Sequence, residues 1–231
     1  MLNVCEVVAK DLDVSFNSAK SKCLVIGPNA GLKPEPMLLK NTAVEWVEKL
    51  NYLGITLKAG KSFEVDISDV RRKFFISVNT ILSKTRFVQD LTRLKLIETH
   101  CLPILLYAVE SIALTNDQLR QLKACWNSVY RRIFNFQRWE SVKELIYLLE
   151  RLDFYHIVKL RRVLFVKRCL DLYRHNNLMV FKCIDIPLIL FDSHCLLSLR
   201  AVNITRPVTK IKSFIHEMFA ESVLQRRLLT V

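Results

Sequence analysis

Two spacings of apolar residues divide the chain near residue 60. In the first part, residues 2–13 have the spacing of an amphipathic helix that ends at a polar turn. Short strand-like runs follow, at residues 22–26, 36–39, 42–47 and 52–57. The last run contains Gly54, and a glycine inside a strand marks a bulge or the close approach of another backbone. The pattern predicts one helix and a small antiparallel sheet for residues 1–60.

From residue 61 onward the apolar positions recur at helical intervals. The clearest stripe consists of Leu119, Leu122, Trp126, Val129 and Ile133. Other stripes run through Val70, Phe74, Val78 and Ile81, through Leu94, Ile97, Cys101, Ile104 and Ala108, and through Ile157, Leu160, Leu164 and Val166. Pro103 should kink or break the stripe around Ile97. These stripes predict a bundle of about four helices over residues 61–175, with the apolar side chains in its core.

Beyond residue 175 the apolar pattern weakens, and only residues 216–229 again have a helical spacing. Residues 176–231 are therefore predicted to be a helical C-terminal extension. Taken together, the elements predict an α+β fold that is mostly α, with a small sheet and helix followed by a helical bundle.

The composition places the chain among ordinary globular proteins, with 51% hydrophobic and 25% charged residues. The longest uncharged apolar run in the middle of the chain, residues 101–109, is far shorter than the ~20 residues of a membrane span. The first residues carry acids and lack a basic segment followed by an apolar core, so they do not resemble a signal peptide. We therefore expect a soluble protein of the nucleus or cytoplasm, without a membrane partner.

The residues that most often bind transition metals are scattered. The seven cysteines include no Cys-x-x-Cys pair, and the five histidines form no close pair. We expect the cysteines to be reduced and mostly buried. We also expect that this chain holds no metal and no cofactor of its own.

The basic excess lies almost entirely in the second part of the chain. Residues 1–60 hold 7 Lys/Arg and 6 Asp/Glu, whereas residues 61–231 hold 28 and 16, a net charge of +12 out of a total of +13. A one-sided excess of this size predicts a polyanionic partner, with nucleic acid as the first candidate. An acidic lipid surface, an acidic protein, or a solvated basic surface without function remain as alternatives.

Three segments occur in a fixed order: FNSAKSKC at 16–23, NYLGITL at 51–57 and HCLPILLYAVES at 100–111. Together they resemble the reverse transcriptase of non-LTR (LINE-type) retrotransposons. In that family a helix leads into an FN-x-x-KS/T motif and a strand, which form motif D of the polymerase palm. A Y-L-G-I/V hairpin follows as motif E, the primer grip, and then a helical thumb with a CLP-x-LLY-like segment. The resemblance covers about residues 2–175 and implies a palm remnant in 1–60 and a thumb in 61–175.

The same resemblance shows which catalytic residues are missing. In the family, aspartates of motif A and of a Phe/Tyr-x-Asp-Asp motif C hold the catalytic metals, and both motifs precede motif D. Closely placed carboxylates are needed because two metal ions must clamp the attacking and leaving oxygens. This chain has no Asp-Asp pair, and Asp11 and Asp13 fit an exposed helix end. The resemblance therefore implies the C-terminal part of an RNA-directed DNA polymerase, inactive alone, whose upstream palm and fingers bind Mg²⁺.

The resemblance also gives roles to individual residues of the palm remnant. Lys20 would be the proton donor to the departing pyrophosphate, which suits a flexible cationic side chain. Asn17 and Ser18 are expected to shape the turn through side-chain to backbone hydrogen bonds. The primer grip would consist of Tyr52, Leu53, Gly54 and Ile55. Gly54 would let the primer backbone come close, or would be only a hairpin bulge.

The basic cluster Arg71, Arg72 and Lys73 matches no motif of the family. It fits the start of a thumb helix, where it could contact phosphates of an RNA–DNA template–primer without base specificity. A plain solvated face is the alternative.

Two functions from different classes follow. The first is the C-terminal part of a retrotransposon polymerase that contributes the primer grip and template–primer binding. The second is a stand-alone basic helical module, derived from such an element, that binds nucleic acid or another partner. They differ in whether coding sequence upstream supplies motif C. The position of Met1, where the family's helix already runs, favours the polymerase fragment.

Overall fold

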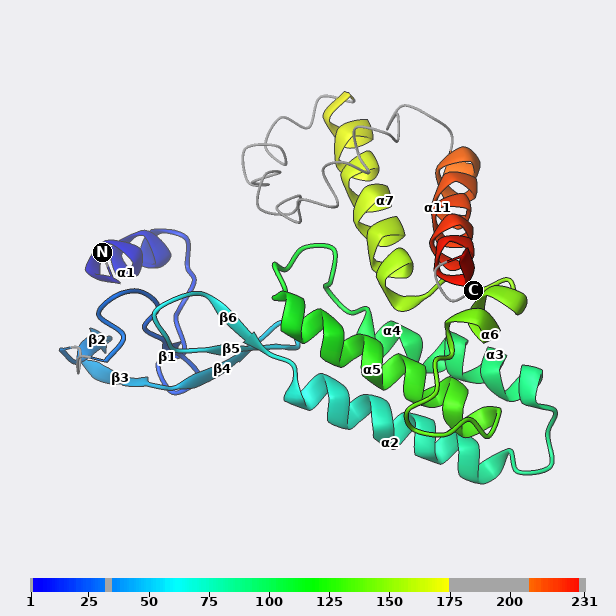
Figure 1. Cartoon of the computed structure of the whole chain (residues 1–231). Helices are drawn as coiled ribbons and strands as arrows, with labels where there is room; N and C mark the ends of the chain where they lie inside the picture. The colour runs from blue at the N-terminus through cyan, green and yellow to red at the C-terminus, as the bar shows by residue number, and fades with distance from the viewer. Residues whose placement is uncertain (1, 32–34, 175–207, 229–231) are drawn as a thin grey trace. The chain divides into compact units, whose positions relative to one another are not determined.

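The computed structural model describes residues 2–31, 35–174 and 208–228 (Figure 1). The chain divides into two compact units, residues 1–69 and 70–231. The expected fold class, α+β and mostly α, is confirmed. Part of the predicted C-terminal extension, at residues 176–207 and 229–231, lies outside the described residues, as do four of the cysteines and histidines discussed above: His175, Cys183, His194 and Cys195.

The first unit opens with helix α1 (Leu2–Asp11), which lies against strand β2 (Met37–Leu39). Strand β3 (Thr42–Trp46) pairs antiparallel with β2 on one side and parallel with β1 (Lys22–Cys23) on the other. The sequence predicted a purely antiparallel sheet, and the parallel pairing of β1 with β3 corrects that prediction. Strand β3 lies between β1 and β2 in the sheet. The chain forms β2 at the edge of the sheet and returns through a tight turn as β3, which therefore runs in the same direction as β1.

A second sheet follows in the same unit, with the order β4-β5-β6 and antiparallel pairing throughout. Its strands are β4 (Lys49–Tyr52), β5 (Ile55–Lys58) and β6 (Glu64–Asp66). The single strand predicted around Gly54 is thus two strands joined by a turn. Strand β6 falls where the sequence predicted the onset of helical spacing, because three residues are too few to establish a two-residue period. An isolated bridge between Ile26 and Gly60 joins the two sheets.

The described part of the second unit consists of helices. They are α2 (Ser68–Lys84, whose first two residues belong to the first unit), α3 (Asp90–His100), α4 (Leu102–Leu105), α5 (Asn116–Ile133), α6 (Lys143–Leu148), α7 (Phe154–Arg174) and α11 (Val208–Leu228). The four long ones before residue 175 correspond to the predicted bundle. The break at Pro103 is confirmed, since α3 ends at His100 and Pro103 lies in the first turn of α4.

The predicted stripes contribute much of the core of this unit, although Val70, Ile81, Ile104 and Ala108 are only half-buried. All five residues of the α5 stripe are buried, and Trp126 and Ile97 are fully buried. Helix α5 starts with a capping box, in which the Thr115 side chain and the Gln118 side chain each bond the other residue's backbone N–H. Helix α7 packs on both α5 and α11, and Val163 of α7 meets Ile211 of α11 in a fully buried contact.

The face of α7 that is buried differs in part from the predicted one. Val158, Val163 and Val166 are buried, whereas Leu160 and Leu164 are half-buried at the edge. Arg162, which lies between the predicted apolar positions, is buried and donates a hydrogen bond from Nε to the backbone oxygen of Val109 at 3.2 Å. A buried arginine is tolerated because its donors find such acceptors.

Candidate nucleic-acid interface

The FNSAKS segment folds as a turn before β1. The Asn17 Oδ1 accepts a hydrogen bond from the Lys20 backbone N at 3.2 Å, and the Ser21 hydroxyl donates to the Asn17 backbone oxygen at 2.9 Å. The expected turn-forming role of Asn17 is therefore confirmed. The Lys20 side chain is exposed at the end of this turn, where a cationic group can reach an external phosphate.

Residues 52–55, the predicted primer grip, form the tip of the β4–β5 hairpin. Tyr52 pairs with Ile55 across the turn, so Leu53 and Gly54 are its two central residues. Their φ angles are +49° and +79°, the two positive values of a type I′ turn. Tyr52 is 61% exposed and Leu53 71% exposed. The hairpin thus presents a tyrosine and a leucine to the surroundings on a tight turn.

Asp66, a residue that no sequence motif singled out, fixes the base of this hairpin. Its Oδ2 accepts from Lys49 Nζ at 2.8 Å and lies 3.6 Å from Lys58 Nζ, while Oδ1 accepts from the Ser68 backbone N at 2.9 Å. The hydrogen bond from Lys49 is the main cause that holds the pKa of this buried carboxyl far below its usual range. The sequence signal was an Asp two residues before a Ser at a helix start, which is typical of an Asx turn.

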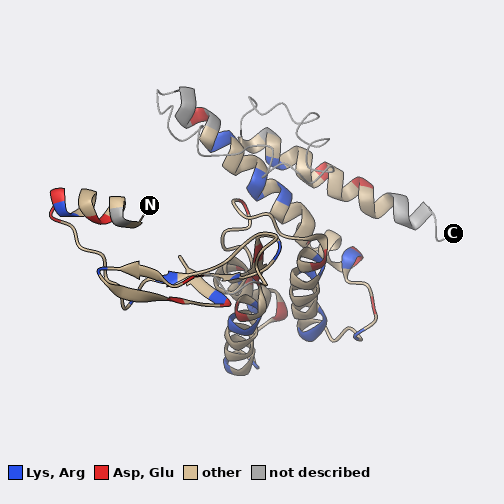
Figure 2. Ribbon diagram, turned by 90° about the vertical axis from the view of Figure 1, so that its left-hand side faces the viewer, with Lys and Arg blue, Asp and Glu red and all other residues tan. Residues whose placement is uncertain are grey.

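The cluster at residues 71–73 begins in the first turns of α2, and its members point in different directions. Arg71 is half-buried, and its Nη1 donates to Gln121 Oε1 of α5 at 2.9 Å. Arg72 and Lys73 are exposed. Arg71 therefore has a structural role between two helices, whereas the other two residues lie at the surface of the helix. Figure 2 shows Lys and Arg residues distributed along the helices of the second unit.

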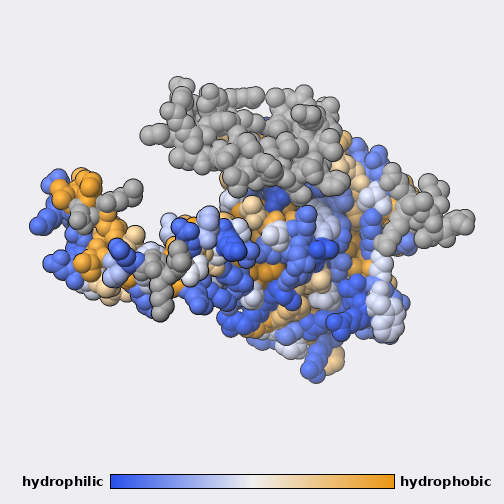
Figure 3. All heavy atoms as spheres, turned by 60° about the vertical axis from the view of Figure 1, so that its left-hand side comes forward, coloured by the Kyte–Doolittle hydropathy of each residue, from blue (hydrophilic) through white to orange (hydrophobic). Residues whose placement is uncertain are grey.

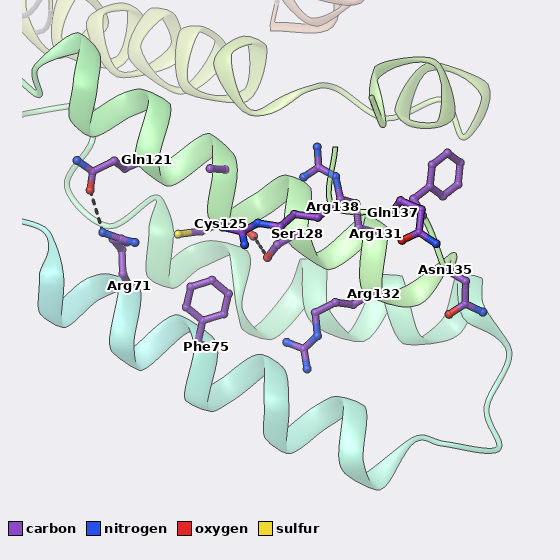
Figure 4. Close-up of a pocket in the computed structure, with 12 residues that line it drawn as sticks. Arg71, Phe75, Gln121, Cys125, Ser128, Arg131, Arg132, Asn135, Gln137 and Arg138 are labelled. Carbon is purple, nitrogen blue, oxygen red and sulfur yellow. Dashed lines mark hydrogen bonds between the residues drawn. The ribbon is translucent and has the colours of Figure 1, made fainter. Parts of the chain in front are cut away.

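A groove of about 860 Å³ lies between α2, α5 and the loop that follows α5 (Figure 4). Four arginines line it: Arg71, Arg131, Arg132 and Arg138. Figure 4 shows Phe75 from α2 and Arg132 from α5 extending into the space between the two helices. Among the described residues that line the groove there is no carboxylate. The groove is therefore electropositive along its length.

This groove was missed at the level of sequence, although a signal for it exists. The segment from 131 to 139 reads RRIFNFQRW, in which three arginines are interspersed with three aromatic residues. Interleaved basic and aromatic residues are typical of surfaces that bind nucleic-acid strands. The candidate sites fall in both units: Lys20 and the hairpin tip belong to the first unit, and the 71–73 cluster and the groove to the second.

The described residues contain no group of three His, Cys, Asp or Glu side chains that could hold a metal ion. Cys101, Cys125 and Cys169 are buried as expected, whereas Cys5 is exposed. Within the described part of the chain, no helix has the length and apolar character that crossing a membrane requires.

Comparison with known proteins gives no match of any kind: neither a family model, nor a curated protein, nor a solved structure resembles this chain closely enough to be counted. The reverse transcriptase resemblance thus depends on the three ordered motifs alone.

Proposed function

We propose that this chain is the C-terminal part of a retrotransposon RNA-directed DNA polymerase, which contributes the primer grip and template–primer binding and does not polymerise alone. The observation that carries the proposal is the hairpin at residues 52–55. The YLGI motif, matched by sequence only, falls on a tight turn with two exposed side chains. A turn of this kind brings a backbone close to another chain, which is what gripping a primer requires.

The surface of the first unit is consistent with an upstream polymerase partner. One face of α1 and the segment after it exposes large apolar side chains, namely Val4, Val7, Val8, Leu12, Val14 and Phe16. Figure 3 shows apolar side chains gathered at this helix. Exposed apolar patches mark interaction sites. In the proposed enzyme the upstream palm and fingers, which carry the metal-binding aspartates, cover this face.

Within that enzyme, Lys20 would donate a proton from Nζ to the departing pyrophosphate and neutralise part of its charge. Its position at the end of an exposed turn leaves the side chain free to approach a phosphate. The second unit supplies affinity, because its basic residues bind backbone phosphates without regard to base sequence.

A stand-alone nucleic-acid-binding or interaction module, derived from such an element, is the second candidate. It is favoured by the second unit, whose helices bury their own continuous core around Trp126 and whose groove is lined by four arginines. Such a unit needs no polymerase partner in order to fold or to bind a polyanion.

Binding to an RNA–DNA hybrid tests the part that both candidates share. We expect affinity to fall steeply with salt and to change little with sequence. Arg72→Ala and Lys73→Ala should each reduce the slope of log K against log salt by about 0.9, because each phosphate contact releases about that many counterions. Arg120→Ala, an exposed α5 arginine paired with Asp117, is the control and should change the slope less. Binding that ignores ionic strength would contradict the proposal.

Primer extension on a homopolymer template with Mg²⁺ or Mn²⁺ separates the two candidates. We expect no extension by this chain alone, and extension by a longer polypeptide that continues upstream through motif C. Lys20→Ala should slow the longer polypeptide, whereas Lys10→Ala, an exposed lysine of α1, should not. Extension by the chain alone would refute the polymerase-fragment proposal, and inactivity of both would favour the binding module.

A further inference from the structure

We propose that the groove between α2 and α5, together with the turn at residues 137–140, binds a single-stranded segment of nucleic acid and stacks an unpaired base on Trp139. The inference depends on the proposed function for the class of ligand, nucleic acid. It adds the form of that ligand and a binding site separate from the hairpin and from Arg72 and Lys73.

The charge of the groove fits a phosphate backbone. Within the described residues, Arg132 and Arg138 make no ion pair and no hydrogen bond, so their guanidinium groups are available to a ligand. Arginine donors match phosphate oxygens in pairs, which makes them well suited to backbone phosphates. A volume of about 860 Å³ is in the range of sites that hold ligands larger than a single ion.

The turn that carries Trp139 is held in place by several hydrogen bonds. Arg131 of α5 donates from Nε and Nη2 to the Glu140 backbone oxygen at 3.0 and 2.9 Å. The Glu140 backbone N donates to the Gln137 oxygen at 3.2 Å, and the Glu140 carboxylate accepts from the Gln137 backbone N. Residues 137–140 therefore form a closed β-turn that is tied to the helix beside the groove.

Trp139 is the third residue of this turn and is 81% exposed. An exposed tryptophan on a fixed turn has no role in the core, because burial is what makes a large aromatic side chain stabilising. Its sequence neighbour Arg138 lines the groove, so the turn that carries Trp139 lies at the edge of the positively charged channel. The combination of an electropositive groove with a presented aromatic ring is the arrangement by which proteins bind single strands.

Stacking on the indole ring of Trp139 requires that the base of the ligand is unpaired. Bases of a duplex are stacked on each other and paired, so their faces are not accessible to an indole at the side of the helix. An unpaired base has an open π-face, which any of the four bases can offer. The groove should accordingly bind single strands of different sequence with similar affinity, whereas the exposed cations of the second unit bind the duplex.

The experiment measures binding of the full chain to labelled oligothymidine, oligouridine, an abasic oligonucleotide of the same length and an RNA–DNA hybrid. Trp139→Ala should weaken oligothymidine and oligouridine binding about 5- to 140-fold, since stacking contributes about 1–3 kcal/mol per base. It should leave the abasic oligonucleotide and the hybrid unchanged, and Trp139→Phe should restore most of the affinity. Arg132→Ala and Arg138→Ala should each lower the salt slope for single strands, the abasic one included, by about 0.7.

The controls are Tyr107→Ala, an exposed aromatic residue that does not line the groove, and Arg120→Ala on the same helix as Arg132. Neither should change single-strand binding, and circular dichroism should show that all variants fold. Hybrid binding without single-strand binding, or an equal loss of hybrid and single strand on Trp139→Ala, would overturn this inference and leave the proposed function standing. Absence of binding to every oligonucleotide would refute the proposed function itself. A difference between oligothymidine and oligouridine would decide whether the strand is DNA or RNA.

Discussion

The two units of this protein are stabilised in different ways. In the second unit, α5 alone buries seven side chains, Leu119, Leu122, Cys125, Trp126, Val129, Tyr130 and Ile133. The buried apolar side chains described in the first unit are Ala9, Leu39, Val44, Val65 and Ile67. Since apolar burial is the main driving force of folding, the second unit should hold its structure independently. The first unit depends more on polar contacts such as those of Asp66, and on whatever covers α1.

The largest expected effect tests this difference with the same substitution in both cores. Leu122→Ala in α5 should lower the free energy of unfolding of the second unit by about 4–5 kcal/mol, because a rigid, densely packed core cannot close the cavity. Leu39→Ala in β2 should lower that of the first unit by about 2 kcal/mol, since a small core collapses more easily. Both side chains are almost fully buried in the parent chain.

Hydrogen exchange followed by mass spectrometry resolves the two units and gives each its own free energy of opening. Leu122→Ala should reduce amide protection in the second unit and leave the first unit's strands unchanged. An equal loss of protection in both units from either substitution would show that the chain unfolds as one cooperative body, and the comparison would fail.

The same contrast explains how far the sequence could predict the fold. Long amphipathic stripes, such as the one through Trp126, produce a repeated signal, so the long helices of the second unit were predicted, and the core face of α5 with them. Strands of three or four residues give too short a signal, so β6 and the split at Gly54 were missed. Asp66 was missed because its partners Lys49 and Lys58 come from strands whose pairing is not visible in the sequence.

Among candidate sites, motifs with a local shape were placed correctly, and those formed by tertiary packing were not. The turn at Asn17 follows from residue types in a short segment, whereas the hairpin at Gly54 was implied by the family resemblance and not by the apolar pattern. The three basic residues at 71–73 looked equivalent in sequence, yet Arg71 faces α5 and pairs with Gln121. The groove exists only because α2 and α5 lie side by side, which no single segment encodes.

The next effect concerns acid stability, because the described residues of each unit include one buried aspartate, Asp66 in the first and Asp153 in the second. Burial raises the pKa of Asp153, but the hydrogen bond and charge of His156 and the charge of Lys123 outweigh it and set the pKa at about 2. A folded-state pKa below the unfolded value of about 3.9 means that the stabilisation is present above that pH and is lost as pH falls toward 2. Asp153→Asn should therefore cost the second unit about 2 kcal/mol at neutral pH and flatten its pH dependence below pH 4.

For Asp66 the folded-state pKa is lowered too, so the first unit should likewise lose stability as pH falls below about 4. Asp66→Asn should flatten that dependence in the first unit only, and Asp153→Asn in the second only. Exchange measured between pH 2 and 7, corrected for the intrinsic rate, checks both. Asp117→Asn, an exposed carboxylate of α5, is the control and should change neither profile. A pH profile that either variant changes in both units would contradict independent stabilisation.

The smallest expected effect lies at the hairpin tip, where stability and the proposed function oppose each other. Leu53 has a φ of +49°, a conformation that is strained for a leucine and that asparagine tolerates. Leu53→Asn should therefore stabilise the first unit by up to about 1 kcal/mol. If the tip grips a primer, the same change should weaken hybrid binding severalfold, because it removes an apolar contact.

Leu38→Asn, at an exposed leucine of β2 outside the motif, is the control and should neither stabilise the unit nor weaken binding. A more stable Leu53→Asn chain with undiminished hybrid affinity would mean that the leucine is not a contact residue, and the primer-grip assignment would lose its main support.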